Sequence, residues 1–138
     1  MIFELITKNK ILQKGLEELS AFCSFTLGAG GKKIVAKQEG NGLFVEANGE
    51  EISITFSTLA QFYLGFGYCL QRYGETAFSF QGKSCDLQLG FLRDCSNNAC
   101  LSFEGFKRLV QALALMGYTY IELYFEDLME IPSMPYLG

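Results

Sequence analysis

The sequence contains no histidine and no tryptophan. Without histidine, the chain cannot carry a Ser-His-Asp or Cys-His catalytic arrangement. Without tryptophan, it lacks the large flat ring on which proteins often stack a sugar. Both absences indicate a chain that is poorly equipped to catalyse a reaction by itself.

Charged residues are also scarce, since they make up 19% of the 138 residues while 49% are hydrophobic. So low a charge content predicts apolar surface that a partner or more chain covers. The net charge of −4 disfavours nucleic acids and anionic membranes as partners.

Long apolar runs are missing as well, and none reaches the roughly 18 residues of a membrane span. The initial segment, MIFELITKNK, has neither the basic start nor the long apolar stretch of a secretory signal. We therefore expect a cytoplasmic protein with neither a membrane nor a nucleic acid among its partners.

The cysteines are odd in number, and no two of them have C-x-x-C spacing. They are Cys23, Cys69, Cys85, Cys95 and Cys100. This pattern favours free thiols in a reducing compartment over a disulfide framework. No spacing suits zinc, and we expect neither a metal nor a cofactor.

Residues 1–84 have the pattern of a small α+β domain. Asn9 is placed to cap an amphipathic helix, and Asn48-Gly49 is the strongest short signal for a hairpin turn. The pattern predicts an antiparallel sheet with two helices. The expected strands are 3–6, 33–39, 43–47, 51–56 and 76–81, and the expected helices run from Asn9 to about Cys23 and over 58–73.

The helix expected at 58–73, with Ser57 as its cap, is apolar on nearly all sides. Phe62 and Phe66 belong to one stripe, whereas Leu64 and Tyr68 cover much of the remaining surface. A helix of this kind is covered on more than one side. One side can lie on the sheet, and the other requires a second layer.

Residues 27–33, LGAGGKK, combine glycines with lysines and suggest a phosphate-binding loop. Such a loop follows a strand and opens a helix, whose N-terminal N–H groups bind the anion. Here the expected order is helix, glycines, strand, and no Ser or Thr follows the lysines. The segment is better explained as a connection between a helix and a strand.

Residues 85–138 have a different pattern. Segments 86–93 and 118–125 read as strands, and between them Ser102 is placed to cap a helix over 103–116. A strand, a crossover helix and a second strand make a βαβ unit with parallel strands. Because parallel strands are buried on both faces and rarely occur in twos, this unit predicts the first segment of a larger structure.

Polar residues follow both predicted strands of this unit. Arg93 and Asp94 end the first strand, and Glu126 and Asp127 end the second. In β/α barrels the functional residues lie at these strand ends, so the four side chains could converge on one ligand. An arginine with several carboxylates suits the hydroxyl groups of a sugar. The alternative is an Arg–carboxylate pair that only ties the strand ends together.

Residues 89–138 resemble the opening of the catalytic barrel of bacterial β-N-acetylhexosaminidase-like proteins, glycoside hydrolase family 20. The shared features are, in order, DCSNN (94–98), a helix ending in LALMGY (113–118), LYFED (123–127) and PYLG (135–138). More loosely, residues 1–84 resemble the small α+β domain that precedes the barrel in that family. The resemblance implies two domains, 1–84 and 85–138, the second being the start of a truncated TIM-type barrel.

The resemblance implies a fragment of an enzyme that removes terminal N-acetylhexosamine residues by retaining hydrolysis, with the substrate's acetamido group as nucleophile. The family's catalytic Asp-Glu pair ends the fourth barrel strand, so this chain would hold no catalytic residue and would be inactive alone. Arg93, Asp94, Glu126 and Asp127 would bind substrate. The partners would be a carbohydrate in the full-length protein, and the remainder of the barrel or a second copy of the chain.

Two positions depart from the family pattern. Leu89 stands where many members have an arginine that holds the sugar's distal hydroxyls, and Asn97 stands where many have a second arginine. These departures leave open a barrel hydrolase that acts on a different sugar. A different class of function is also open, namely a stand-alone α/β interaction module that self-associates or binds a partner protein.

Overall fold

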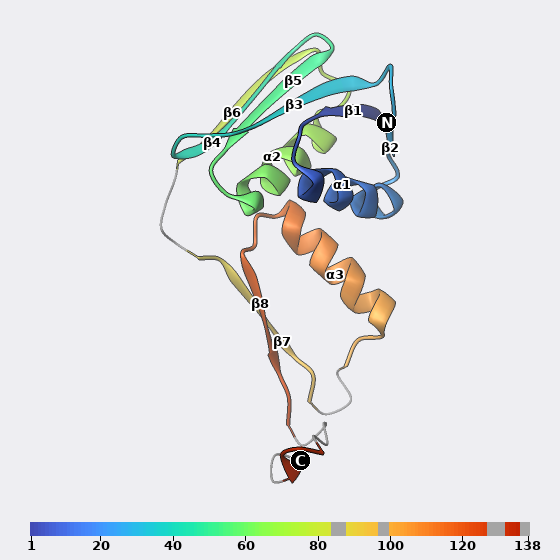
Figure 1. Cartoon of the computed structure of the whole chain (residues 1–138), viewed down its shortest axis with the longest axis vertical. Coiled ribbons are helices and arrows are strands. Elements are labelled where there is room, and N and C mark those ends of the chain that lie inside the picture. The colour runs from blue at the N-terminus through green and yellow to red at the C-terminus, as the bar shows by residue number, and fades with distance from the viewer. Residues whose placement is uncertain (84–87, 97–99, 127–131, 136–138) are drawn as a thin grey trace.

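The computed structural model describes residues 1–83, 88–96, 100–126 and 132–135. The described part of the chain contains eight strands and three helices. They form a six-stranded sheet, a layer of two helices beneath it, and a third helix with a two-stranded sheet that extends away from the first (Figure 1). The mixed α/β class expected from the sequence is therefore confirmed.

The six-stranded sheet is mixed, which corrects the antiparallel sheet that we predicted. In spatial order the strands are β2 (Thr26–Leu27), β1 (Ile2–Ile6), β3 (Lys32–Gln38), β5 (Glu51–Phe56), β4 (Gly42–Asn48) and β6 (Ala77–Lys83). Three of the five strand pairs are parallel and two, both made by β4, are antiparallel. Helix α1 (Lys10–Cys23) accounts for the two parallel pairs of β1, because a helical crossover returns the chain in its original direction. The parallel β3–β5 pair arises because the chain reverses into β4 and again into β5.

The predicted hairpin at Asn48-Gly49 is confirmed between β4 and β5. Asn48 pairs with Glu51, and Gly49 has a φ of 65°, which suits glycine in such a turn. The preceding connection does not form a hairpin, since β5 lies between β3 and β4.

The glycine-rich segment connects two strands and crosses the start of β1. A Cβ on Gly31 would lie 2.5 Å from the carbonyl carbon and oxygen of Ile2, so only glycine fits there. Gly28 donates its N–H to the Phe3 carbonyl oxygen at 2.9 Å. The short strand β2 before these glycines was not predicted. Because β3 rather than a helix follows them, no helix N-terminus is available for phosphate.

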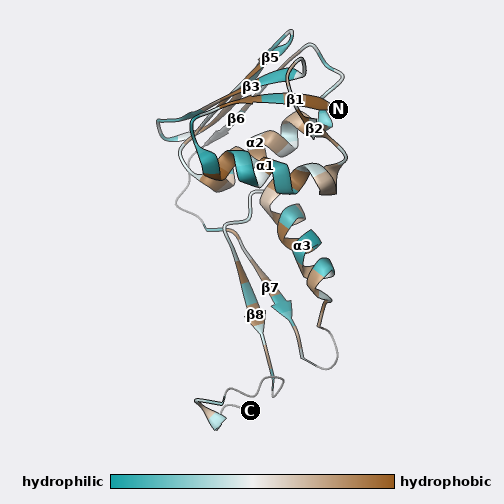
Figure 2. Ribbon diagram, turned by 45° about the vertical axis from the view of Figure 1, so that its right-hand side comes forward, coloured by the Kyte–Doolittle hydropathy of each residue, from teal (hydrophilic) through white to brown (hydrophobic). Residues whose placement is uncertain are grey.

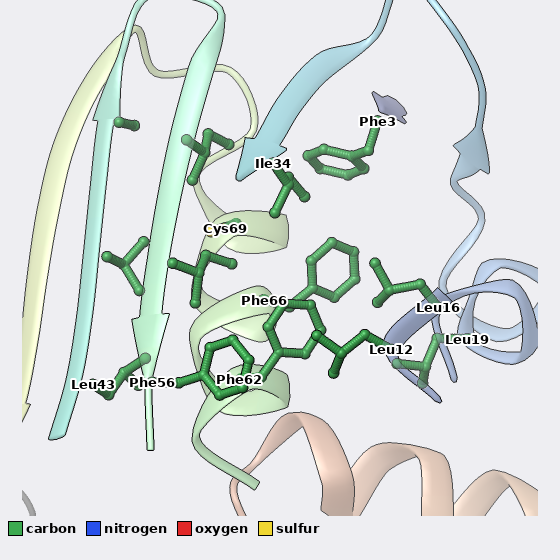
Figure 3. Close-up of a cluster of buried hydrophobic side chains, with 14 of the residues drawn as sticks. Phe3, Leu12, Leu16, Leu19, Ile34, Leu43, Phe56, Phe62, Phe66 and Cys69 are labelled. Atoms are coloured by element: carbon green, nitrogen blue, oxygen red, sulfur yellow. The ribbon is translucent and has the colours of Figure 1, made fainter. Parts of the chain in front are cut away.

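The core lies between the sheet and helices α1 and α2. Figure 3 shows Leu12, Leu16 and Leu19 of α1 pointing at Phe62 and Phe66 of α2. All five side chains are buried. The leucines share one face of α1, and its opposite face is solvated, as the amphipathic pattern predicted.

Both helices begin at the kind of cap that their sequences suggest. The Asn9 side chain accepts hydrogen bonds from the N–H groups of Ile11 and Leu12, as predicted. Helix α2 (Leu59–Gln71) starts one residue later than expected, because Thr58 and not Ser57 is its cap. Thr58 and Gln61 form a reciprocal capping box.

Helix α3 (Phe103–Leu115) forms the second layer that the apolar α2 required. Gly65 of α2 faces Leu43 and Val45 of the sheet, whereas Gly67 faces the backbone of Leu115. Helix α2 is thus covered on two sides, as predicted.

Helix α3 also contacts α1 through polar groups at Glu18. The Lys107 ammonium lies 2.9 Å from the Glu18 carboxylate. The Gln111 side-chain amide donates to the Glu18 carbonyl oxygen at 3.0 Å. Helix α3 of the βαβ unit therefore contacts both helices that pack on the six-stranded sheet, α1 and α2.

Strands β7 (Gly90–Asp94) and β8 (Tyr120–Tyr124) are parallel, with Gly90 opposite Tyr120 and Asp94 opposite Tyr124. The predicted βαβ unit is confirmed. In both views the two strands run beside α3 and away from the six-stranded sheet (Figures 1 and 2). The predicted domain boundary near residue 84 lies outside the described residues. No described helix has the length and apolar character needed to cross a membrane.

Candidate functional site

The carboxyl ends of β7 and β8 meet at one edge, as parallel pairing requires. The Cys95 N–H continues the pairing beyond β7 and donates to the Tyr124 carbonyl oxygen at 2.8 Å. The predicted site residues Asp94 and Glu126 therefore both lie at this edge.

Asp94, Tyr124 and Glu126 belong to one face of the β7–β8 pair. Asp94 is opposite Tyr124 in register, and the Tyr124 hydroxyl donates to the Glu126 carboxylate at 3.0 Å. All three residues are exposed. Two carboxylates and a phenol on one open face can bind the hydroxyl groups of a polar ligand.

Arg93 points to the opposite face, because neighbouring residues of a strand alternate between its two faces. Its side chain lines a pocket of about 150 Å³ on the side of α3. The other lining residues are Cys95, Cys100, Leu101, Phe106, Leu123 and Phe125. This pocket is apolar and smaller than the roughly 300–1,000 Å³ of typical ligand sites.

The four predicted residues are thus not all brought together. Asp94 and Glu126 share a face and Arg93 lies on the other, while Asp127 is outside the described residues. The expected convergence of the four on one ligand overlooked the alternation of side chains along β7. A role for them in substrate binding remains a prediction.

Asp94 is held by the turn that follows β7. Hydrogen bonds from the Ser96 hydroxyl and then from the Ser96 N–H, the latter at 2.7 Å, lower the pKa of Asp94. Desolvation opposes these hydrogen bonds by raising the pKa of Asp94, and the neighbouring Arg93 guanidinium, with a smaller effect, lowers it. The Asp94 side chain is therefore ionised at neutral pH, is held in place by Ser96, and is exposed to solvent.

Tyr124 was missed as a candidate by sequence reasoning. Its place opposite Asp94 depends on the register of two strands that are far apart in the chain, which one sequence does not give. Its position two residues before Glu126 was the available signal, because such residues share a face. Among the departures from the family pattern, Leu89 is exposed and accepts hydrogen bonds from Thr119, whereas Asn97 is outside the described residues.

The described residues do not gather three or more Cys, Asp or Glu side chains into a group that could hold a metal ion. The free cysteines among them are Cys23, Cys69, Cys95 and Cys100, while Cys85 lies outside the described part.

The described fold is a mixed sheet backed by helices, followed by a parallel βαβ unit with polar residues at its strand ends. Two solved structures that share this fold are structures of a glycoside hydrolase. The chain matches a GH20 exo-β-N-acetylglucosaminidase from Vibrio harveyi, in complex with N-acetylglucosamine, at a TM-score of 0.64 and 21% identity. It matches an inactive mutant of that enzyme, with one aspartate replaced by alanine, at a TM-score of 0.66 and 23% identity.

Both matches cover 98% of this chain and 24% of the solved chain. This chain therefore spans about a quarter of the length of the enzymes that it resembles. At this level of identity the likeness establishes a shared fold. No protein-family model matches the sequence, and no curated protein does either.

Proposed function

We propose that this chain is part of a glycoside hydrolase that removes terminal N-acetylhexosamine residues by substrate-assisted, retaining hydrolysis. The observation that carries the proposal is the fold likeness to exo-β-N-acetylglucosaminidase structures over 98% of the chain. The parallel β7–α3–β8 unit supports it, because barrel enzymes build their sites at the carboxyl ends of parallel strands.

In this proposal Asp94 and Glu126 accept hydrogen bonds from sugar hydroxyls. The Tyr124 hydroxyl orients Glu126, and the exposed phenol ring offers an apolar face in a chain without tryptophan. Asp127, next to Glu126 in sequence, is included as a further ligand of the sugar. Arg93, which lines the pocket on the α3 side, is included as a sugar ligand that approaches from that side of the strand end.

The proposal assigns no catalytic residue to this chain. In the substrate-assisted scheme, one carboxylate orients the acetamido group and an adjacent glutamic acid protonates the leaving group. Neither Asp94 nor Glu126 has a neighbouring partner in the Asp-Glu order. We therefore expect the 138-residue polypeptide to be inactive by itself.

The coding DNA beyond Gly138 provides the first test. Further βα units in the same reading frame would support the proposal, whereas a stop codon there would argue for a stand-alone module. The 138-residue chain and any longer product would then be assayed with 4-nitrophenyl N-acetyl-β-D-glucosaminide. Turnover by the longer product alone is expected, and turnover by the 138-residue chain would contradict the assignment.

Substitutions in the active longer product would test the site. Asp94→Ala and Glu126→Ala should each lower kcat/KM about 10- to 100-fold, the worth of a hydrogen bond to a charged group. Glu46→Ala is the matched control, because Glu46 is an exposed carboxylate on β4 and should leave kcat/KM unchanged. Equal effects of all three would show that the β7–β8 edge is not the sugar site.

Self-association is a second candidate function, favoured by apolar side chains exposed on the βαβ unit. Phe103 is 79% exposed, Met116 59% and Leu92 58%. A monomer by analytical ultracentrifugation at micromolar concentration would argue against this candidate, and a dimer dissociated by Leu92→Asp would support it.

A further inference from the structure

Two thiols lie together at the end of β7. Cys95 is 7% exposed and Cys100 is open to solvent. The Cys100 Sγ–H donates to the Cys95 carbonyl oxygen at 3.0 Å, and both side chains line the small pocket beneath α3. The Cys100 sulfur therefore contacts Cys95, the residue with which it could form a disulfide.

We propose that Cys95 and Cys100 form a redox-modification site, a dithiol that a peroxide converts reversibly into a disulfide. The Cys100 thiol releases its proton and the thiolate attacks a peroxide oxygen; the O–O bond breaks, and the departing hydroxide takes up that proton, so that a sulfenic acid and water result. The Cys95 thiol then releases its proton and its thiolate displaces hydroxide from the Cys100 sulfur; the S–S bond forms, and the hydroxide takes up the proton and leaves as a second water. Two electrons pass from the thiols to the peroxide.

The order of the two steps follows from access and charge. Cys100 is the residue that solvent and peroxide can reach. Burial, the neighbouring Cys100 thiol and the Asp94 carboxylate all raise the pKa of Cys95, against a lowering effect of Arg93. Since the thiolate is the reactive form, Cys95 is the slower nucleophile toward peroxide and serves as the resolving thiol.

The other described cysteines are not placed for this chemistry. Cys69 is fully buried in the core, where burial raises its pKa to about 12. Cys23 is partly buried on α1, and burial raises its pKa as well. Among the described cysteines, Cys95 and Cys100 are therefore the pair that the fold places for this chemistry.

The disulfide would tie the end of β7 to the residue that lies three positions before α3. The disulfide would thus restrain Cys95, the residue next to Asp94, whose carboxylate already accepts a hydrogen bond from the Ser96 N–H. The inference does not depend on the proposed function, because the two thiols are joined whatever ligand the strand ends bind.

Peptide mass spectrometry on the 138-residue chain tests the proposal. The native protein is treated with a small excess of hydrogen peroxide, alkylated with iodoacetamide and cut with trypsin, which leaves Cys95 and Cys100 together on peptide 94–107. We expect this peptide to lose both alkyl groups and to be lighter by two hydrogen atoms. Dithiothreitol given before alkylation should restore both alkyl groups.

Two comparisons show whether the fold causes the reaction. The bridge should form faster in the native chain than in chain unfolded by guanidinium chloride, and Cys23→Ser should leave it unchanged. Cys95→Ser should convert the product to an over-oxidised or intermolecularly linked Cys100. Full alkylation of both thiols after peroxide, a bridge to another cysteine, or equal rates in native and unfolded chain would each overturn the proposal.

Discussion

Replacing Gly67 with alanine tests the packing of α3, the helix of the βαβ unit, on helix α2. A Cβ on residue 67 would lie 2.6 Å from the Leu115 carbonyl oxygen and 3.4 Å from that residue's carbonyl carbon and Cβ. Ordinary contacts need about 3.5 Å, so helices α2 and α3 must separate by about 1 Å. The obstacle is backbone, which cannot rotate away as a side chain can.

Two opposing effects set the expected size of the change. Overpacking of this kind costs about 1–3 kcal/mol, and alanine is favoured over glycine inside a helix by about 1 kcal/mol. We expect a net loss of about 1 kcal/mol in the free energy of unfolding. With a typical urea dependence of about 2 kcal/mol per molar, the unfolding midpoint falls by about 0.5 M.

Urea unfolding followed by circular dichroism measures this change, and amide hydrogen exchange locates it. Protection should fall in α3 and remain in the six-stranded sheet. Gly15→Ala on α1 is the control, because its methyl would meet the Tyr63 side chain, which can move. A Gly67→Ala protein stabilised by about 1 kcal/mol, the gain from helix propensity alone, would refute the described contact.

Three further predictions concern single groups. Phe66→Ala removes a fully buried ring that contacts Phe3 and Phe25. It should lower the free energy of unfolding, measured with urea, by about 3–5 kcal/mol. A loss under about 1 kcal/mol would contradict the burial of Phe66 in the core. The lowered pKa of Asp94 gives stability that is present above about pH 4 and is lost as pH falls further. Asp94→Asn should abolish that part of the pH dependence, and unchanged acid unfolding would argue against the Ser96 contact. The Cys69 thiol, with its pKa raised to about 12, should not react with a thiol reagent at pH 8 until the chain unfolds.

Local sequence signals predicted most of the elements of this fold. The cap at Asn9, the hairpin at Asn48-Gly49 and the cap at Ser102 each act over three or four residues, and each is present. The all-round apolar character of α2 correctly required a second layer, because a helix that is apolar on nearly all sides is covered on more than one side.

The order of the strands could not be predicted in the same way. The insertion of β5 between β3 and β4 depends on contacts that are distant in sequence. The two-residue strand β2 is too short to give a periodic signal, and the close approach of Gly31 to Ile2 becomes visible only once β2 and β3 flank β1.

The candidate site was predicted in part for a related reason. The parallel βαβ pattern correctly placed Asp94 and Glu126 at one edge of the unit. Adjacency in sequence made Arg93 seem to be a neighbour of both, although a strand sends successive side chains to opposite faces. Tyr124 joins the site through register, which a single sequence does not encode locally.

The measurement that tests this account most directly is the direction of β8 relative to β7 in solution. Nuclear Overhauser contacts between backbone protons of the isotope-labelled chain would report it. The account predicts contacts that pair Gly90 with Tyr120 and Asp94 with Tyr124, so that both polar strand ends share one edge. Contacts that pair Gly90 with Tyr124 would make the strands antiparallel, separate Asp94 from Glu126, and remove the basis for a barrel-type sugar site.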